Sequence, residues 1–153
     1  MEVHAITHVG RVRSRNEDRY LVQQRPDGTL VLGVADGLGG HAGGEVAAQE
    51  VVTALSKLDC VDCNVEDQLR KLVLEADRSI CERADRMPEL EGMGATLTGV
   101  VILGGTAHWV QVGDSRLYLV RNGITRQITK DQTMLQFLLD EGEITEQIGR
   151  AHV

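Results

Sequence analysis

The chain has 153 residues, 42% of them hydrophobic, which fits one folded domain and argues against a disordered segment. It carries 16 basic and 23 acidic residues, and the net charge of −7 excludes the cationic surface that nucleic acids and anionic membranes attract. No apolar run approaches the ~20 residues that cross a bilayer. Three cysteines, an odd number, argue against a disulfide scaffold. We therefore expect a cytoplasmic protein with no nucleic-acid or membrane partner.

Two strands joined by a tight turn come first in the predicted order of elements. Residues 19–24 and 29–36 flank the sequence Pro26-Asp27-Gly28, whose Asp-Gly pair is typical of a β-hairpin. The second run is almost entirely apolar, as expected for a strand that is covered on both faces. It leads into residues 36–44, DGLGGHAGG, where the many glycines predict a tight loop.

Two helices are expected next. Residues 45–58 place apolar side chains at intervals of three and four, which gives one buried helical stripe. The second helix is expected to begin after Asn64, a residue type that caps helices, with acidic residues in its first turn. It is expected to end near Pro88.

Four strands and a last helix complete the predicted order. Residues 95–103, 106–112, 116–120 and 124–128 are separated by short turns that contain glycine, which predicts an antiparallel meander. The last helix is expected to begin near Lys130, and Trp109 and Phe137 are interpreted as core residues. Helices and strands are segregated along the chain, so the fold class is α+β.

Four short motifs bring together residue types that can carry chemistry. They are an arginine followed by two acids at 13–18, the glycine loop that starts at Asp36, GATL at 94–97 and GDSR at 113–116. Taken singly, each is also compatible with an ordinary strand or surface turn. The loop at Asp36 is the most informative, because a carboxylate at the end of a buried strand is costly without a partner. Carboxylates and carbonyls are the ligands that Mg²⁺ and Mn²⁺ prefer.

In this order, the motifs resemble those of the metal-dependent protein serine/threonine phosphatases of the PPM type (type 2C), in their bacterial form. The resemblance runs from about Thr7 to Glu146 and includes the TKD segment at 129–131. It implies a central antiparallel β-sandwich flanked by helices (αββα). It also implies hydrolysis of phosphoserine and phosphothreonine in proteins that a serine/threonine kinase has modified. The implied cofactors are two Mn²⁺ or Mg²⁺ ions, with room for a third, and the implied oligomeric state is a monomer.

The resemblance also assigns roles to individual residues. Arg13 matches the family's phosphate-binding arginine, and Asp36 matches the carboxylate that bridges two metals. The remaining implied ligands are the main-chain carbonyl of Gly37, the acidic pair Glu17 and Asp18, and Asp114 at a third metal site.

The implied reaction is an in-line attack on phosphorus by a water that the metals activate. Eukaryotic relatives have a histidine directly after the Asp-Gly pair, but this chain has Leu38 there. The proton donor is then either a metal-bound water or His41. The other interpretation of His41 is a loop residue with no chemical role.

The family pattern is incomplete in this sequence. Two further aspartates, which the family places in its C-terminal third, have no counterpart. We therefore expect residues 1–147 to be the N-terminal portion of a single phosphatase domain, incomplete at the C-terminus. We expect residues 148–153, IGRAHV, to be a non-native tail. Metal binding should then be weak, activity low, and the exposed sandwich interior prone to aggregation.

Two other functions stay open at this stage. The first is a non-catalytic, phosphoprotein-binding pseudophosphatase that keeps Arg13 but cannot assemble its metals. The second is a dinucleotide site, because residues 37–42 fit the pattern G-x-G-x-x-A. The hairpins expected later in the chain do not suit the parallel fold that such a site requires.

Overall fold

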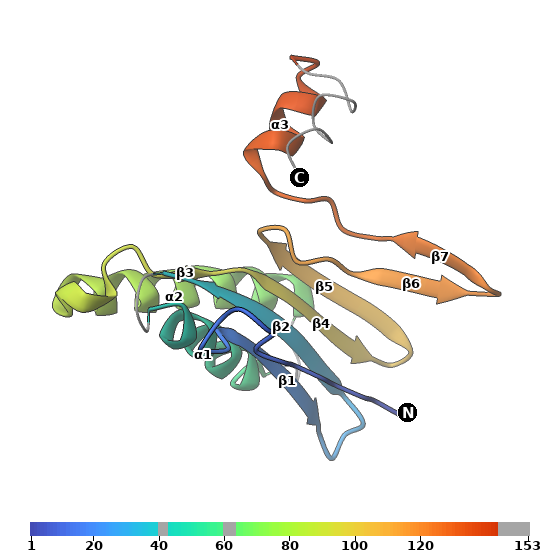
Figure 1. Cartoon of the computed structure of the whole chain (residues 1–153). Helices are drawn as coiled ribbons and strands as arrows, with labels where there is room; N and C mark the ends of the chain where they lie inside the picture. Colours follow the sequence, from blue (N-terminus) through green and yellow to red (C-terminus); the bar gives the residue numbers. More distant parts are fainter. Residues whose placement is uncertain (40–42, 60–63, 144–153) are drawn as a thin grey trace.

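The computed structural model describes residues 1–39, 43–59 and 64–143 of the chain. Its main element is a five-stranded antiparallel sheet with the order β1-β2-β4-β5, in which the short β3 also pairs with β2. Helices α1 and α2 lie side by side on one face of this sheet (Figure 1). The predicted α+β class with antiparallel strands and segregated helices is confirmed.

Strands β1 (Asp18–Gln24) and β2 (Leu30–Leu38) form the predicted hairpin. Its turn is stabilised by the Asp27 carboxylate, which accepts a hydrogen bond of 2.8 Å from the Thr29 N–H. β2 runs two residues further than expected, because its end pairs with β3 (Gly94–Ala95). The prediction that a loop begins at Asp36 is therefore wrong, and the glycine-rich segment starts as strand.

Helices α1 (Gly43–Ser56) and α2 (Val65–Arg86) match the two expected helices. Asn64 caps α2 as predicted, since its side chain accepts a hydrogen bond of 3.0 Å from the Glu66 N–H. Leu55 of α1 is fully buried and lies over Gly33, where an added Cβ would come within 2.2 Å of its Cδ2 atom. The glycine thus makes room for a large side chain between the helix and the sheet.

A short 3₁₀ helix, Pro88–Leu90, follows α2 and leads to β4 (Leu97–Leu103) and β5 (Thr106–Val112). The core lies between the sheet and the helices and includes the fully buried Val31 and Val101. Trp109 does not belong to it: the residue is 51% exposed, because it lies opposite Val100 on the face of the sheet that the helices do not cover, whereas the neighbouring Val110 packs against the core. Its interpretation as a core residue is therefore wrong.

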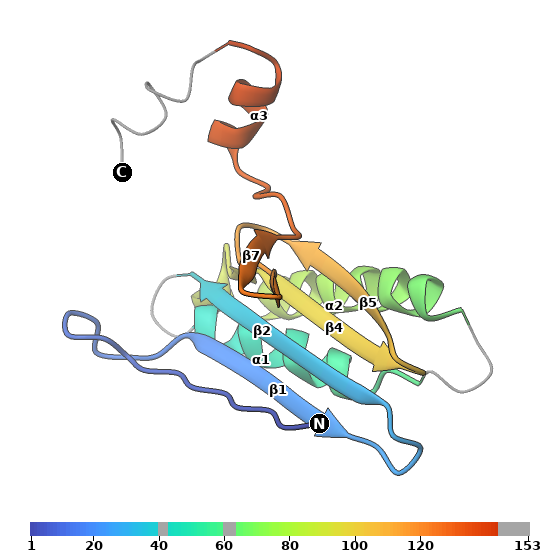
Figure 2. The same cartoon turned by 90° about the vertical axis from the view of Figure 1, so that its right-hand side faces the viewer.

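Strands β6 (Tyr118–Arg121) and β7 (Ile124–Gln127) form a separate two-stranded sheet. The expected four-strand meander is therefore wrong after β5. The chain turns away there because Gly113 adopts a left-handed conformation (φ 92°) and its N–H donates to the Gln132 side chain at 3.0 Å. The β6–β7 hairpin projects from the sheet on the side opposite the helices (Figures 1 and 2).

Helix α3 (Met134–Asp140) begins four residues after the expected start, because Thr133 caps it by accepting a hydrogen bond of 3.1 Å from the Gln136 N–H. It projects beyond the hairpin (Figure 1), and Phe137 is 57% exposed, contrary to its core interpretation. Among the described helices, none is both long and apolar enough to span a membrane. Residues 148–153 lie outside the described residues, so the proposed non-native tail is not tested.

Candidate active site

Strand pairing brings two of the predicted acids together. Asp18, the first residue of β1, lies directly opposite Asp36 near the end of β2. Residues opposite each other in an antiparallel pair point to the same face of the sheet. Both side chains are exposed, whereas Ala35 and Gly37, which flank Asp36 in β2, are buried toward α1. The two carboxylates therefore share the face that the helices do not cover.

The electrostatic environment of Asp36 suits a cation. Burial raises the pKa of its carboxyl above the ordinary value, and the neighbouring Asp18 raises it further, by its charge and by a hydrogen bond between the two side chains. Asp114 raises the pKa of Asp36 as well, while the positive charge of Arg13 lowers it. Three of the predicted site residues are thus close enough to Asp36 to change its titration.

Glu17 points toward helix α1. Its carboxylate lies against Gly44, where an added Cβ would come within 3.0 Å of the Glu17 Oε1 atom, and it pairs with the Arg13 Nη1 atom at 3.2 Å. Arg13 itself is largely exposed. The structure therefore places the predicted phosphate-binding arginine beside an acid at the rim of the site.

Gly37 must be a glycine at its place in β2. A Cβ at this position would lie 2.0 Å from the Gly44 carbonyl oxygen and 2.8 Å from the Glu17 carbonyl oxygen. The Gly37 N–H donates a hydrogen bond of 3.3 Å to that same Glu17 carbonyl. The first turn of α1 and the residues before β1 thus press against the strand end that carries Asp36.

Thr96 connects the two acidic segments, a role that the sequence did not indicate. The Asp36 N–H donates to its Oγ1 atom at 3.0 Å, and the Thr96 N–H donates to the Asp36 carbonyl at 2.9 Å. The same Oγ1 shares a hydrogen bond of 2.8 Å with the Ser115 hydroxyl, next to Asp114. The GATL segment thus ties the end of β2 to the turn that carries Asp114.

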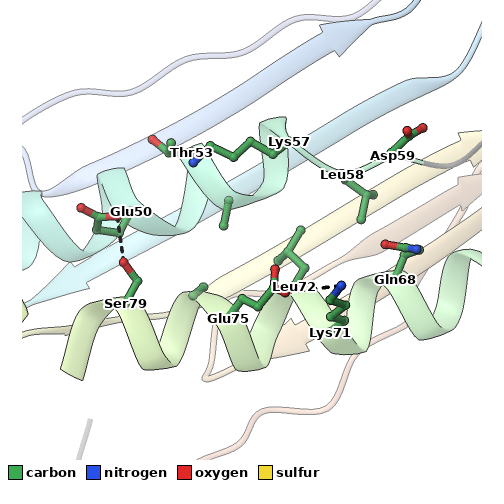
Figure 3. Close-up of a pocket in the computed structure, with 12 residues that line it drawn as sticks. Glu50, Thr53, Lys57, Leu58, Asp59, Gln68, Lys71, Leu72, Glu75 and Ser79 are labelled. Atoms are coloured by element: carbon green, nitrogen blue, oxygen red, sulfur yellow. Dashed lines mark hydrogen bonds and ion pairs between the residues drawn. The ribbon is translucent and has the colours of Figure 1, made fainter. Parts of the chain in front are cut away.

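The two acids open into a hollow of about 470 Å³. It is lined by the N-terminal segment 6–8, the start of β1, the end of β2 and Ser115. Another hollow, of about 320 Å³, lies between α1 and α2 on the far side of the sheet (Figure 3). Three of its charged side chains have partners: Glu50 accepts from the Ser79 hydroxyl at 3.3 Å, and Lys71 pairs with Glu75 at 3.6 Å. This second hollow contains none of the predicted site residues.

The donor chemistry of the site fits a divalent metal ion. Carboxylates with a main-chain carbonyl nearby are ligands for Mg²⁺ or Mn²⁺, and a pair of adjacent carboxylates is stabilised by a bound cation. Within the described ranges, however, no three His, Cys, Asp or Glu side chains form a group that could hold a metal. The described residues therefore provide a carboxylate pair with charged neighbours. His41, the candidate proton donor, lies outside the described residues.

Comparisons with known proteins agree with this geometry. The family model described as protein phosphatase 2C matches residues 7–148. Serine/threonine protein phosphatase PstP of Mycobacterium tuberculosis is 44% identical over 146 residues, which cover 94% of this chain and 27% of PstP. Serine/threonine phosphatase stp of Listeria monocytogenes is 35% identical over 154 residues, which cover 95% of this chain and 60% of that protein.

Solved structures give the same result. The crystal structure of the Mycobacterium tuberculosis phosphatase superimposes with a TM-score of 0.83 at 41% identity, covering 94% of this chain and 60% of the other. The PstP catalytic domain in complex with two manganese ions gives a TM-score of 0.80 with the same identity and coverage. This chain thus spans less than two thirds of the proteins it matches. It belongs to the protein phosphatase 2C family.

Proposed function

We propose that the protein carrying this chain is a metal-dependent phosphatase that hydrolyses phosphoserine and phosphothreonine in proteins. The observation that supports this most directly is the Asp18–Asp36 pair. Two adjacent carboxylates, one with a raised pKa, face a common hollow near Arg13 and Asp114. Family membership and the names of the relatives point to the same reaction.

The metal would be Mn²⁺ or Mg²⁺, held by Asp36 and Asp18 with the carbonyl of Gly37. Asp114 would serve a further ion, and Glu17 would support the group through its position beside Asp18. A bound divalent ion supplies Lewis-acid activation of water for attack on a phosphoryl ester. The strand pairing of Asp18 with Asp36 fixes the spacing of the two carboxylates.

Arg13 would bind the phosphoryl group. A guanidinium presents parallel N–H donors that match two phosphate oxygens, and the Arg13 side chain is exposed enough to reach a substrate. Its present partner, Glu17, is held by a single ion pair of 3.2 Å. Only the Arg13 end of this pair is exposed, and Glu17 is mostly buried, so a phosphate would compete with Glu17 for the free N–H donors of the guanidinium.

The substrates would be proteins phosphorylated by a serine/threonine kinase. We further propose that the protein acts as a monomer in the cytoplasm. The exposed free thiol of Cys81 suits a reducing compartment. Residues 1–147 would form the N-terminal portion of the phosphatase domain.

The proposal is tested by Mn²⁺ binding and by catalysis. Mn²⁺ binding to the 153-residue chain is measured by calorimetry for the wild type, Asp36→Asn and the control Asp77→Asn, which removes an exposed acid from α2. For catalysis, residues 7–147 replace the matching segment of the PstP catalytic domain, and hydrolysis of a phosphothreonine peptide is followed with Mn²⁺. The isolated chain should hydrolyse the peptide slowly, because the described residues contain no group of three metal ligands.

Asp36→Asn should abolish both Mn²⁺ binding and turnover by the chimera, and Asp77→Asn should change neither. Arg13→Ala should lower turnover while leaving Mn²⁺ binding unchanged. A chimera that binds the phosphopeptide through Arg13 without hydrolysing it would instead support the phosphoprotein-binding alternative. Mn²⁺ binding that does not depend on Asp36 would contradict the proposed site.

A further inference from the structure

Arg19 occupies an unusual place behind the carboxylate pair. It follows Asp18 in β1 and lies opposite Ala35, so its side chain leaves the sheet on the helix side. The Nη1 atom donates to two main-chain carbonyls, that of Asn16 at 3.0 Å and that of Asp18 at 2.7 Å. The Nη2 atom donates to the Glu45 carboxylate at 2.5 Å.

These contacts fix the main chain on both sides of Glu17. The carbonyl of Glu17 accepts from the Gly37 N–H, so all three carbonyls of residues 16–18 have a donor, two of them supplied by Arg19. The Asn16 side chain adds a turn by accepting a hydrogen bond of 3.0 Å from the Asp18 N–H. The direction in which Asp18 leaves the backbone therefore depends on Arg19.

Glu45 anchors this arrangement to helix α1. It lies in the first turn of the helix, where the helix dipole favours an acid. The Arg19 and Glu45 side chains are 26% and 44% exposed. An ion pair this accessible to water contributes little to stability by itself. Its effect is to hold the segment before β1 in one orientation against α1.

We propose that Arg19 and Glu45 are positioning residues that keep Asp18 opposite Asp36 and thereby set the affinity of the site for a divalent cation. Neither side chain would touch the ion. The proposal rests on the proposed function only in taking the ligand to be a divalent metal. The arrangement of Arg19, Asn16 and Asp18 can also be tested without any metal.

The charge of Arg19 makes the test selective. Removing a positive charge near a cation site strengthens cation binding if only electrostatics matter. Loss of positioning has the opposite effect, because partners outside the ligand shell orient the ligands and their loss weakens metal binding by about tenfold or more. The direction of the change therefore separates the two explanations.

The experiment measures the Mn²⁺ dissociation constant of the 153-residue chain and of Arg19→Ala, Arg19→Lys and Glu45→Gln. Arg83→Ala is the matched control, because Arg83 makes a comparable ion pair with Glu50 of the same helix α1, away from the site. Arg19→Ala and Glu45→Gln should weaken binding by about tenfold. Arg19→Lys should not restore it, since lysine keeps the charge but lacks the two-pronged donor geometry. Arg83→Ala should change the dissociation constant less than about twofold.

Hydrogen exchange of the metal-free chain provides the second measurement. The Gly37 amide should exchange faster in Arg19→Ala than in the wild type and at an unchanged rate in Arg83→Ala. If Arg19→Ala melts too low to be studied, Arg19→Gln takes its place, because it also removes the positive charge and the two-pronged donor. Unchanged or tighter Mn²⁺ binding in a folded Arg19→Ala chain, or an unchanged Gly37 exchange rate, would overturn the positioning role. A wild-type chain that binds no Mn²⁺ would refute the proposed metal site, and the exchange result would still decide whether Arg19 orders residues 16–18.

Discussion

Asp36 is kept in an unfavourable environment by its position in the sheet. Like charges directly opposite each other in an antiparallel pair are destabilising, and burial adds to the cost of ionising this carboxyl. The fold tolerates the pair because the strand pairing that creates it also buries the apolar residues on the other face of β2. Carboxylates with raised pKa values in a hollow are typical of functional sites.

We predict that Asp36→Asn stabilises the metal-free chain at neutral pH by about 0.5 kcal/mol, the size of a cross-strand pair interaction. The pKa of Asp36 is raised on folding. The contribution of Asp36 to the free energy of unfolding is therefore favourable at low pH, and it is lost as the pH rises through the pKa of the folded state. The gain from Asp36→Asn should therefore grow with pH. Thermal melts over a pH series measure it.

Asp27, at the other end of the same hairpin, is the control for this prediction. The Thr29 N–H lowers the pKa of Asp27, so its contribution is present at neutral pH and is lost as the pH falls through the folded-state pKa. Asp27→Asn should leave the melting temperature unchanged or lower it at neutral pH. Equal pH trends for the two variants would show that the Asp18–Asp36 contact does not govern the effect.

At the site, the sequence predicted residue types better than contacts. Asp18 and Asp36 can be found from motifs, and hairpin pairing then brings them together. The Arg13–Glu17 pair depends on side-chain conformations that no spacing encodes. The contact of Thr96 with Asp36 spans 60 residues and depends on the register of three strands, so no local pattern reports it.

Among the elements, β2 and the first turn of α1 are in close main-chain contact. An added Cβ at Gly37 would meet the Gly44 carbonyl, and one at Gly44 would come within 2.9 Å of the Gly37 carbonyl carbon. Main-chain atoms cannot move aside as a flexible side chain can. This contact fixes how near the helix lies to the strand that carries Asp36.

We predict that Gly37→Ala destabilises the chain by about 3 kcal/mol, the upper range for overpacking a site with no free space. The control is Gly94→Ala in the paired strand β3, where the nearest atom to an added Cβ is the end of the Leu38 side chain at 3.3 Å. That variant should cost less than about 1 kcal/mol. Urea unfolding of both variants measures the difference, and equal costs would contradict the close contact.

Element boundaries were predictable where local signals dominate. The Asn64 cap and the Asp27 turn act within a few residues, so α2 and the first hairpin matched expectation. β2 extends to Leu38 only because residues 94–95 pair with it, and β6 leaves the main sheet because distant residues bind the turn at 113–117. Such non-local contacts are absent from any local pattern.

On the scale of the whole molecule, the two faces of the sheet differ. The helices cover one face, whereas the other carries Tyr20, Val22 and Val34 at 46%, 44% and 47% exposure. Tyr20 and Val34 are directly opposite each other, so the apolar surface is continuous across β1 and β2. Contiguous apolar surfaces of this kind promote association.

We predict that the 153-residue chain self-associates through this face. Val34→Lys should raise the concentration at half-association by about tenfold, because burying one valine contributes about 1.5 kcal/mol. Leu74→Lys, which alters a 65% exposed leucine on α2, is the control and should have little effect. Light scattering over a concentration series measures both, and an equal effect of the two variants would place the contact elsewhere.

The two hydrogen bonds of the Thr96 hydroxyl limit which substitutions the site can accept during evolution. One hydroxyl at position 96 serves both the strand end that bears Asp36 and the serine that follows Asp114. A substitution at position 96 removes both hydrogen bonds at once. The end of β2 and the turn that carries Asp114 would therefore shift relative to each other. Lineages that lose the threonine need a compensating replacement at position 115 to retain the distance between these two segments.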